Sequence, residues 1–195
     1  MSKRFRTILL MSCVVFGWAC SSSVPTDVEG VTAVGEHVLV YEGVDLEVVL
    51  GTGYAVGHLD EEYLLLGASL AGANSNRMTI IDRSKISVYA PDRRTILLMS
   101  QVEFRDAYPS LIAPARRAEV YSPTVLDSRP VRRPCNDWFF RPPTDGLARD
   151  VLTISSIEVC DGILFFHVPG GVPSGDWALE IKLQDSVVEI PFVLD

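Results

Sequence analysis

The sequence predicts an all-β protein: an antiparallel, immunoglobulin-like β-sandwich with one short helix. Three observations lead to this class. Apolar residues alternate with polar ones at a period of two in many short segments, which is typical of half-buried strands. Turn-forming residues separate these segments at short intervals, and one segment alone has the sequence of a helix start. About ten short strands with one helix indicate two packed antiparallel sheets.

The first half of the domain is rich in strand patterns. We expect strands at residues 38–40, 46–50, 54–59, 63–71, 78–80, 86–90 and 96–98. The glycines at 51 and 53, the acidic stretch 60–62 and the pair Pro91-Asp92 provide the turns between them. The run at 63–71 is an apolar segment of strand length, too long to be exposed and too short to span a membrane.

The single expected helix covers residues 101–108. Ser100 and Glu103 have the spacing of a capping box, in which each side chain accepts a hydrogen bond from the backbone N–H of the other residue. Pro109 and Pro114 follow, and a proline within a helix removes a backbone hydrogen bond and clashes with the preceding turn. Residues 110–119 are therefore expected to form no more than a broken turn or two.

The second half begins with a long loop and ends in strands. Residues 122–143 contain five prolines, which indicates an ordered loop or an edge segment. Within it, Trp138-Phe139-Phe140 is an apolar clip that we expect to plug the core. We then expect strands at residues 151–159, 163–168, 177–183 and 187–194. The pairs Asp161-Gly162 and Gly170-Gly171 have the composition of hairpin turns between them.

The chain is organised as a leader, a tether and one domain. Residues 1–19 have a basic start, an apolar stretch of about a dozen residues and small residues at the end, the three zones of a secretory signal. That stretch is shorter than the roughly 20 residues that a membrane-spanning helix needs. Residues 20–35 are rich in Ser, Pro, Thr and Gly and read as a flexible tether, and residues 36–195 form the domain.

The junction at Cys20 resembles the signal peptides of bacterial lipoproteins. Ala19 and Cys20 match that class, whereas Gly17 and Trp18 depart from its four-residue box. The resemblance implies acylation of Cys20 and cleavage just before it. Ser21, rather than Asp, after the cysteine implies sorting to the outer membrane, with the domain facing the periplasm or the cell surface. Gly17-Trp18-Ala19 also fits an ordinary signal peptidase site at the same bond, so simple secretion is the alternative.

Charge and composition limit the classes of partner that we expect for this protein. The chain has 17 Lys and Arg against 25 Asp and Glu. Three of the basic residues lie in the leader, which leaves 14 against 25 and a net charge of −11 after cleavage. This excess of negative charge disfavours nucleic acid as a partner. We expect contact with the membrane through the N-terminal lipid, an envelope protein or glycan as partner, and no cofactor.

Of the four cysteines, two remain once Cys13 is removed with the leader and Cys20 is assigned to the lipid. An even pair in an oxidising compartment predicts a disulfide between Cys135 and Cys160. Two buried free thiols are the alternative. No metal site is expected, because neither cysteine has a second Cys or a His two to four residues away.

Candidate catalytic residues are sparse. Ser69 lies in a near match to the nucleophile-elbow pattern, but Ala71 replaces its last glycine and the segment reads as a strand. His58 is followed by three acids at 60–62, which we interpret as an exposed acidic turn rather than a metal site. His37 and His167 are isolated in expected strands and read as packing residues.

The proline-rich loop offers the best candidate surface for contact with a partner. Its cations and aromatic rings suit anionic glycans, phosphate groups or a protein hot spot. The candidate contact face consists of Arg129, Arg132, Arg133, Trp138, Phe139 and Arg141. Pairing of these arginines with nearby aspartates is the alternative.

The leading hypothesis is a non-enzymatic interaction or accessory module, tethered to the outer membrane of a bacterial envelope. The alternatives are a periplasmic hydrolase or metal-dependent enzyme, and a small-ligand carrier. The enzyme would require a cleft in which either Ser69 and His167 meet an acid, or His58 meets the nearby acids. The carrier would require a sizeable apolar cavity between the sheets.

Overall fold

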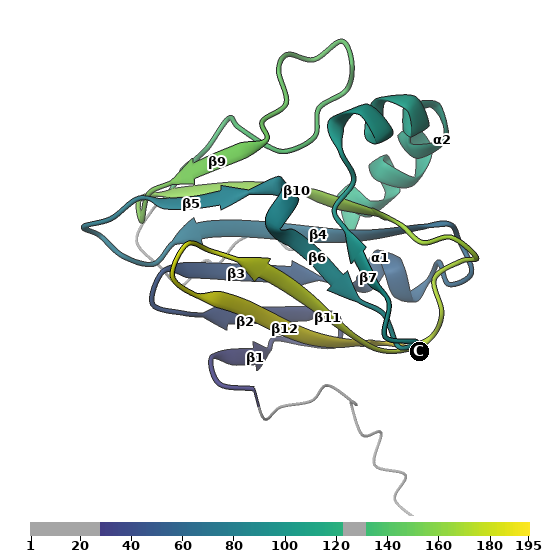
Figure 1. Ribbon diagram of the computed structural model, residues 1–195, viewed down its shortest axis with the longest axis horizontal. Coiled ribbons are helices and arrows are strands. Elements are labelled where there is room, and N and C mark those ends of the chain that lie inside the picture. Colours follow the sequence, from purple (N-terminus) through teal and green to yellow (C-terminus); the bar gives the residue numbers. More distant parts are fainter. Residues whose placement is uncertain (1–27, 123–131) are drawn as a thin grey trace, which may run out of the picture.

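The computed structural model describes residues 28–122 and 132–195. In these ranges the chain folds into two larger sheets around one apolar core, a separate two-stranded ribbon and two α-helices (Figure 1). All strand pairs are antiparallel except the short pairing of β8 with β10. The prediction of an all-β protein built from antiparallel sheets is therefore confirmed.

The larger sheet has six strands. In spatial order they are β1 (Val31–Ala33), β2 (Val38–Glu42), β3 (Leu46–Gly51), β4 (Tyr63–Gly72), β10 (Glu158–His167) and β8 (Arg133–Pro134). The apolar strand expected at 63–71 is confirmed as β4, which is buried at every position after Tyr63. β1 lies inside the segment expected to be a tether, because Val31 and Ala33 pair with β2 across the sheet edge. The ordered domain thus begins before residue 36.

The second sheet has four strands. In spatial order they are β12 (Val187–Leu194), β11 (Gly175–Lys182), β6 (Ile86–Tyr89) and β7 (Thr95–Leu97). The ribbon pairs β5 (Thr79–Asp82) with β9 (Val151–Ile154), and a 3-10 helix, η1 (Arg83–Lys85), joins β5 to β6. Side chains at alternate positions of both sheets, such as Leu66, Leu70, Leu179 and Ile190, are buried in the common core. The result is a β-sandwich-like arrangement.

Helix α2 (Gln101–Val120) is longer than expected. It starts at the predicted capping box, but it continues through Pro109 and Pro114 instead of ending before them. The reason is tertiary packing: Phe104, Leu111 and Ala118 recur every seven residues, form one stripe and are buried. Burial of that stripe offsets the backbone hydrogen bonds that the prolines remove.

Two further local predictions were wrong. Residues 54–59 form no strand; helix α1 (Gly53–Val56) and a turn take their place, and Tyr54 stacks on His58 one helical turn later, with ring centroids 3.7 Å apart. Asp161-Gly162 is not a hairpin turn but lies inside β10, where both residues pair with β4. The turn falls earlier, between β9 and β10.

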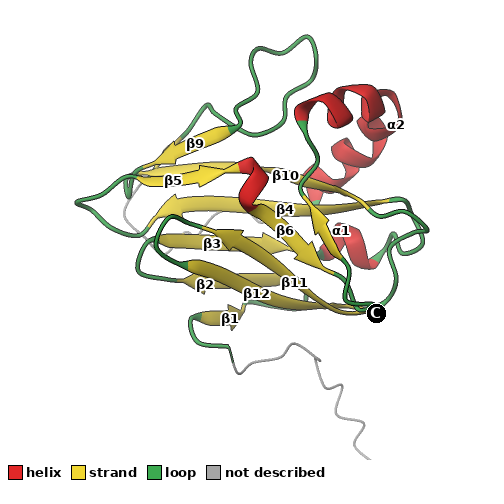
Figure 2. Ribbon diagram, in the orientation of Figure 1, coloured by secondary structure: helices red, strands yellow, loops and turns green. Residues whose placement is uncertain are grey.

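Both helices lie toward the same end of the sheets, and α2 covers β10 and β4 (Figure 2). Phe165 of β10 contacts Phe104 of α2, with ring centroids 4.9 Å apart, whereas its neighbours Leu164 and Phe166 point into the sandwich core. α2 therefore packs on the face of the six-stranded sheet that is turned away from the core. Within the described residues, no helix combines the length and apolarity needed to cross a bilayer.

Candidate ligand-binding groove

One wall of the candidate site is formed by α2. While Phe104, Leu111 and Ala118 anchor the helix, the neighbouring positions Tyr108 and Ile112 stay partly exposed at the side of this stripe. Positions three and four residues apart share a helix face, so these side chains form a continuous row along α2. This row faces the loop that follows β8.

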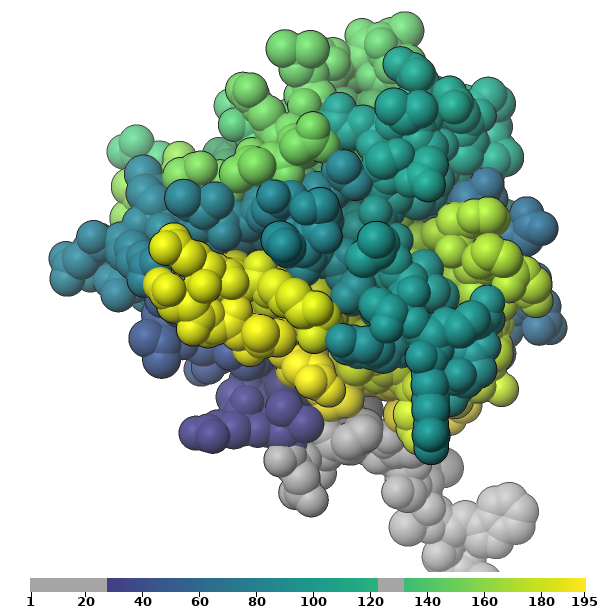
Figure 3. Space-filling model, viewed as in Figure 1, coloured from purple at the N-terminus to yellow at the C-terminus, as the bar shows by residue number. Residues whose placement is uncertain are grey.

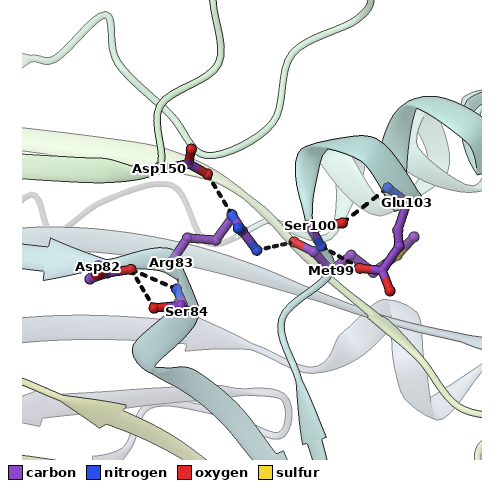
Figure 4. Close-up of polar contacts among 7 residues, drawn as sticks. All are labelled: Asp82, Arg83, Ser84, Met99, Ser100, Glu103 and Asp150. Atoms are coloured by element: carbon purple, nitrogen blue, oxygen red, sulfur yellow. Dashed lines mark hydrogen bonds and ion pairs between the residues drawn. The ribbon is translucent and has the colours of Figure 1, made fainter.

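The start of α2 is fixed by polar contacts (Figure 4). The Ser100 hydroxyl accepts a hydrogen bond from the Glu103 N–H at 3.1 Å, and the Glu103 carboxylate accepts one from the Ser100 N–H at 2.6 Å. These bonds hold the pKa of Glu103 below its ordinary value. The Arg83 guanidinium donates to Met99 O and to Asp150, each at 2.9 Å. Arg83 thus ties the start of α2 to Asp150, the residue that precedes β9.

The second wall is the segment from residue 135 to residue 145, which we call the loop wall. A disulfide attaches it to the sheet. Cys135 and Cys160 are bonded, as predicted, with their Cα atoms 4.9 Å apart. Trp138 lies directly over Gly162, and its indole Nε1–H donates to Ile163 O at 3.1 Å. A Cβ at Gly162 would lie 2.2 Å from the Trp138 ring, so only glycine allows the indole to approach β10 this closely.

The clip 138–140 folds around the edge of β10. Strand alternation puts Gly162 and Phe165 on opposite faces of β10, and Trp138 lies against the first while Phe140 packs on the second. Phe139 between them is fully buried. The expectation that the clip plugs the core is met by these positions, and Phe140 becomes part of the groove.

The groove itself is a cavity of about 490 Å³ between α2, the loop wall and β10. Figure 3 shows the surfaces of α2 and of the loop as adjoining teal and green areas at the top of the molecule. The apolar lining residues are Phe104, Tyr108, Ile112, Ala115, Trp138, Phe140, Pro142, Ile163 and Phe165. The polar lining residues are Arg116, Glu119, Ser122, Arg141, Asp145 and Asp161. A volume of this size and an aromatic lining are typical of small-molecule sites.

Among the polar lining residues, the side chains of Ser122, Arg141 and Asp161 have hydrogen bonds within the described part of the chain; the Ser122 hydroxyl donates to Ala118 O at 3.3 Å. The Ser69 hydroxyl donates to Asp161, its neighbour across the β4–β10 pair, and holds that carboxylate in place on the groove floor. The Arg141 guanidinium donates to the Asn136 carbonyl on the same loop. Close by, Arg149 pairs with Asp137 at 3.1 Å and supports the base of the loop.

The residues of the predicted contact face do not form one surface. Trp138 and Arg141 line the groove. Phe139 is fully buried, and Arg132 pairs with Glu47 at 2.8 Å with 11% and 9% of the two side chains exposed. Arg133 is exposed on β8. Arg129 and Cys20, the residue expected to carry a lipid, lie outside the described residues.

The candidate catalytic residues do not converge. Ser69 contacts an acid, Asp161, but His167 pairs with Tyr63, six residues further along β10. At about 3.3 Å per residue, His167 lies about 20 Å from Asp161. His58 Nδ1 is 2.7 Å from Tyr54 O, and the backbone of the acidic turn pairs with residues 168–172. In the described ranges no three His, Cys, Asp or Glu side chains are grouped as metal ligands.

Sequence reasoning missed the helix wall and the floor. Phe104, Tyr108 and Ile112 recur every four residues, which is a helical signal, but the expected helix end at residue 108 cut the row short. Ile163 and Phe165 read as core residues, since the pattern of β10 cannot tell which face a helix will cover.

Comparison with known proteins finds no matching family model, no matching curated protein and no matching solved structure.

Proposed function

We propose that the protein is a non-enzymatic binding module of the bacterial cell envelope, anchored to the outer membrane by a lipid on Cys20. The groove between α2 and β10 is its binding site, and the domain faces the periplasm or the cell surface. The observation that carries this proposal is a preformed cavity of about 490 Å³, lined by aromatic rings and bordered by charges of both signs.

The envelope location rests on three features of the chain. The leader has the zones of a secretory signal, and Cys20 is followed by a serine tract as in lipoproteins. The Cys135–Cys160 disulfide is typical of an oxidising compartment. Multiple acyl chains on Cys20 would make the attachment stable, since each buried methylene contributes about 0.8 kcal/mol.

The finer fold assignment, an immunoglobulin-like sandwich, is part of the same proposal. Two antiparallel sheets that share one core support it. The disulfide is arranged differently from that of antibody domains, because it joins Cys135, the residue after β8, to the neighbouring strand β10 of the same sheet rather than two facing sheets.

Of the alternative functions, the geometry favours the small-ligand carrier over the enzyme. The distance of about 20 Å from Asp161 to His167 provides no base for Ser69, which argues against a hydrolase. The carrier was expected to hold its ligand between the sheets. The cavity lies instead outside the sandwich, under α2, so carrier and binding module share one site.

Native mass spectrometry of the protein, released gently from envelopes, tests the proposal. Ala115 lines the groove, whereas Ala113, also on α2, is exposed and does not line it. We expect wild type and Ala113→Trp to carry a small-molecule adduct that Ala115→Trp lacks, because the indole fills the cavity. An adduct retained equally by all three proteins, or carried by none, would refute the groove as the binding site.

A further inference from the structure

The groove changes in character along its length. Phe104, Phe140 and Phe165 contact one another, with ring centroids 4.9 to 5.2 Å apart, and line it beside the first turn of α2. Arg116 and Glu119 line it on the later turns of the helix. An apolar section thus continues into a section that carries charge, which is the arrangement that suits an amphiphilic ligand.

The free edge of β10 does not offer a template for an added peptide strand. Strand addition requires unpaired backbone carbonyls and N–H groups along an edge. Here Ile163 O accepts from the Trp138 indole at 3.1 Å, and Phe165 O accepts from the Met99 N–H at 3.0 Å. Side chains, rather than the β10 backbone, are therefore the groups that hold a ligand.

The size of the groove limits the ligand to a small molecule. A helix with its side chains is about 10 Å across, so two turns of it occupy about 800 Å³, more than the cavity holds. About 490 Å³ lies inside the range of small-molecule pockets. A single hydrocarbon chain matches the apolar section, because it is narrow and needs no hydrogen-bond partner.

The charged groups at the groove carry both signs. Two guanidinium groups, from Arg116 and Arg141, line it together with the carboxylates of Glu119, Asp145 and Asp161. Arginine pairs well with phosphate, and a carboxylate pairs with an ammonium group. A ligand head that carries both a phosphate and an ammonium group complements this set, whereas a purely anionic or purely cationic head would meet like charges.

We propose that the groove binds single-chain zwitterionic amphiphiles, molecules with one hydrocarbon chain and a head that joins a phosphate to an ammonium group. The chain lies along Phe104, Ile112 and Phe165, and the head lies among the arginines and carboxylates. This inference rests on the proposed function, since it names the ligand class of that binding site. Single-chain phospholipids in the envelope have this chemistry.

The test uses the full chain with Cys20→Ala, so that no lipid on the protein itself competes for the groove. Isothermal titration with dodecylphosphocholine and dodecyl maltoside, both below micelle-forming concentrations, compares a zwitterionic head with an uncharged head on the same chain. We expect dodecylphosphocholine to bind about tenfold more tightly. Equal affinities for the two probes would overturn the assignment of the head group.

Variants locate the binding site. Ala115→Trp is expected to lower the affinity for dodecylphosphocholine by about tenfold or more, and Ala113→Trp to leave it unchanged. Ile112→Glu, at a half-buried lining position, provides a second block if Ala115→Trp fails to fold, as judged by circular dichroism. Binding that survives both blocks would overturn the proposal.

A double variant distinguishes recognition of the ligand head from binding of its hydrocarbon chain. Replacing Arg116 and Arg141 with Ala should remove the preference for the zwitterionic head and leave binding of dodecyl maltoside within about twofold. Arg105→Ala, on an exposed face of α2, is the matched control. If the mass-spectrometric adduct depends on the groove but dodecylphosphocholine does not bind, the ligand class is wrong while the binding-module proposal stands.

Discussion

The indole of Trp138 packs against Gly162, a residue 24 positions later in the chain, and donates its Nε1–H to Ile163 O at 3.1 Å. This contact determines where the loop wall of the groove stands. It also explains why glycine occurs in the middle of a long, buried strand, where it otherwise weakens the sheet.

Gly162→Ala is expected to destabilise the protein by about 1–3 kcal/mol, because the new Cβ would lie 2.2 Å from the Trp138 ring and the indole must move. Chemical denaturation measures the loss. Gly57→Ala is the control, since its Cβ would meet Tyr54 O at an ordinary 3.7 Å. Similar stabilities for the two variants would show that Trp138 does not pack against Gly162.

The disulfide that attaches this wall should also stabilise the domain by restricting the conformations of the unfolded chain. Its ends are 25 residues apart, and closing a loop of this length stabilises a domain by about 3 kcal/mol in the chain-entropy model. We expect Cys135→Ala/Cys160→Ala to lower the free energy of unfolding by about that amount. A loss as large in wild type under reducing conditions would confirm the cause, and an unchanged denaturation midpoint in both would contradict it.

The continuation of α2 beyond Pro109 can be tested at Leu111, which is fully buried. Leu111→Ala should cost about 2–5 kcal/mol, the usual range for truncation of a buried leucine. Val102→Ala, on the same helix with 56% of the residue exposed, should change the stability by less than about 0.5 kcal/mol. Equal, small effects would mean that the helix ends before residue 111, as the prolines alone suggest.

The sequence predicted correctly those features that depend on residues close together in the chain. The Ser100–Glu103 capping box is formed as its spacing indicated, because both partners lie within one turn. The long apolar run of β4 is buried on both faces. The disulfide was predictable because only Cys135 and Cys160 remained once Cys13 was assigned to the leader and Cys20 to the lipid.

Predictions failed where the structure depends on contacts between residues far apart in the sequence. Asp161-Gly162 has the composition of a turn, and only the approach of Trp138 explains its place inside β10. The prolines of α2 predicted a break, which burial of Leu111 overrides. The groove depends on both contacts, since one places its loop wall and the other extends its helix wall, so it could not be read from the sequence.

The capping box makes a prediction about pH. Hydrogen bonds from the Ser100 N–H and hydroxyl hold the pKa of Glu103 below its ordinary value of 4.5, and the charge of Arg83 acts in the same direction. A carboxylate with a lowered pKa stabilises the fold fully at neutral pH, and this stabilisation is lost as the pH falls through the folded-state pKa. Glu103→Gln keeps the hydrogen-bond acceptor but cannot ionise.

We therefore expect wild type to be more stable than Glu103→Gln by about 0.5 kcal/mol at pH 7, the usual value of a negative charge at a helix N-terminus. The difference should shrink toward zero below the folded-state pKa of Glu103. Urea denaturation of both proteins between pH 7 and pH 3 measures it. A gap that stays constant over this range would show that ionised Glu103 contributes nothing beyond its hydrogen bond.

The anchor can be tested independently of the groove. Cells that express the protein and take up an alkyne-labelled fatty acid should incorporate the label into wild type but not into Cys20→Ala, because the proposal attaches the acyl chains through that cysteine. Cys13→Ala, which removes a cysteine inside the leader, is the matched control and should be labelled like wild type. Absence of label from wild type, with the mature chain free in the periplasm, would instead establish cleavage by an ordinary signal peptidase after Ala19. In that case the groove would belong to a diffusing carrier, and the tethered module would be excluded.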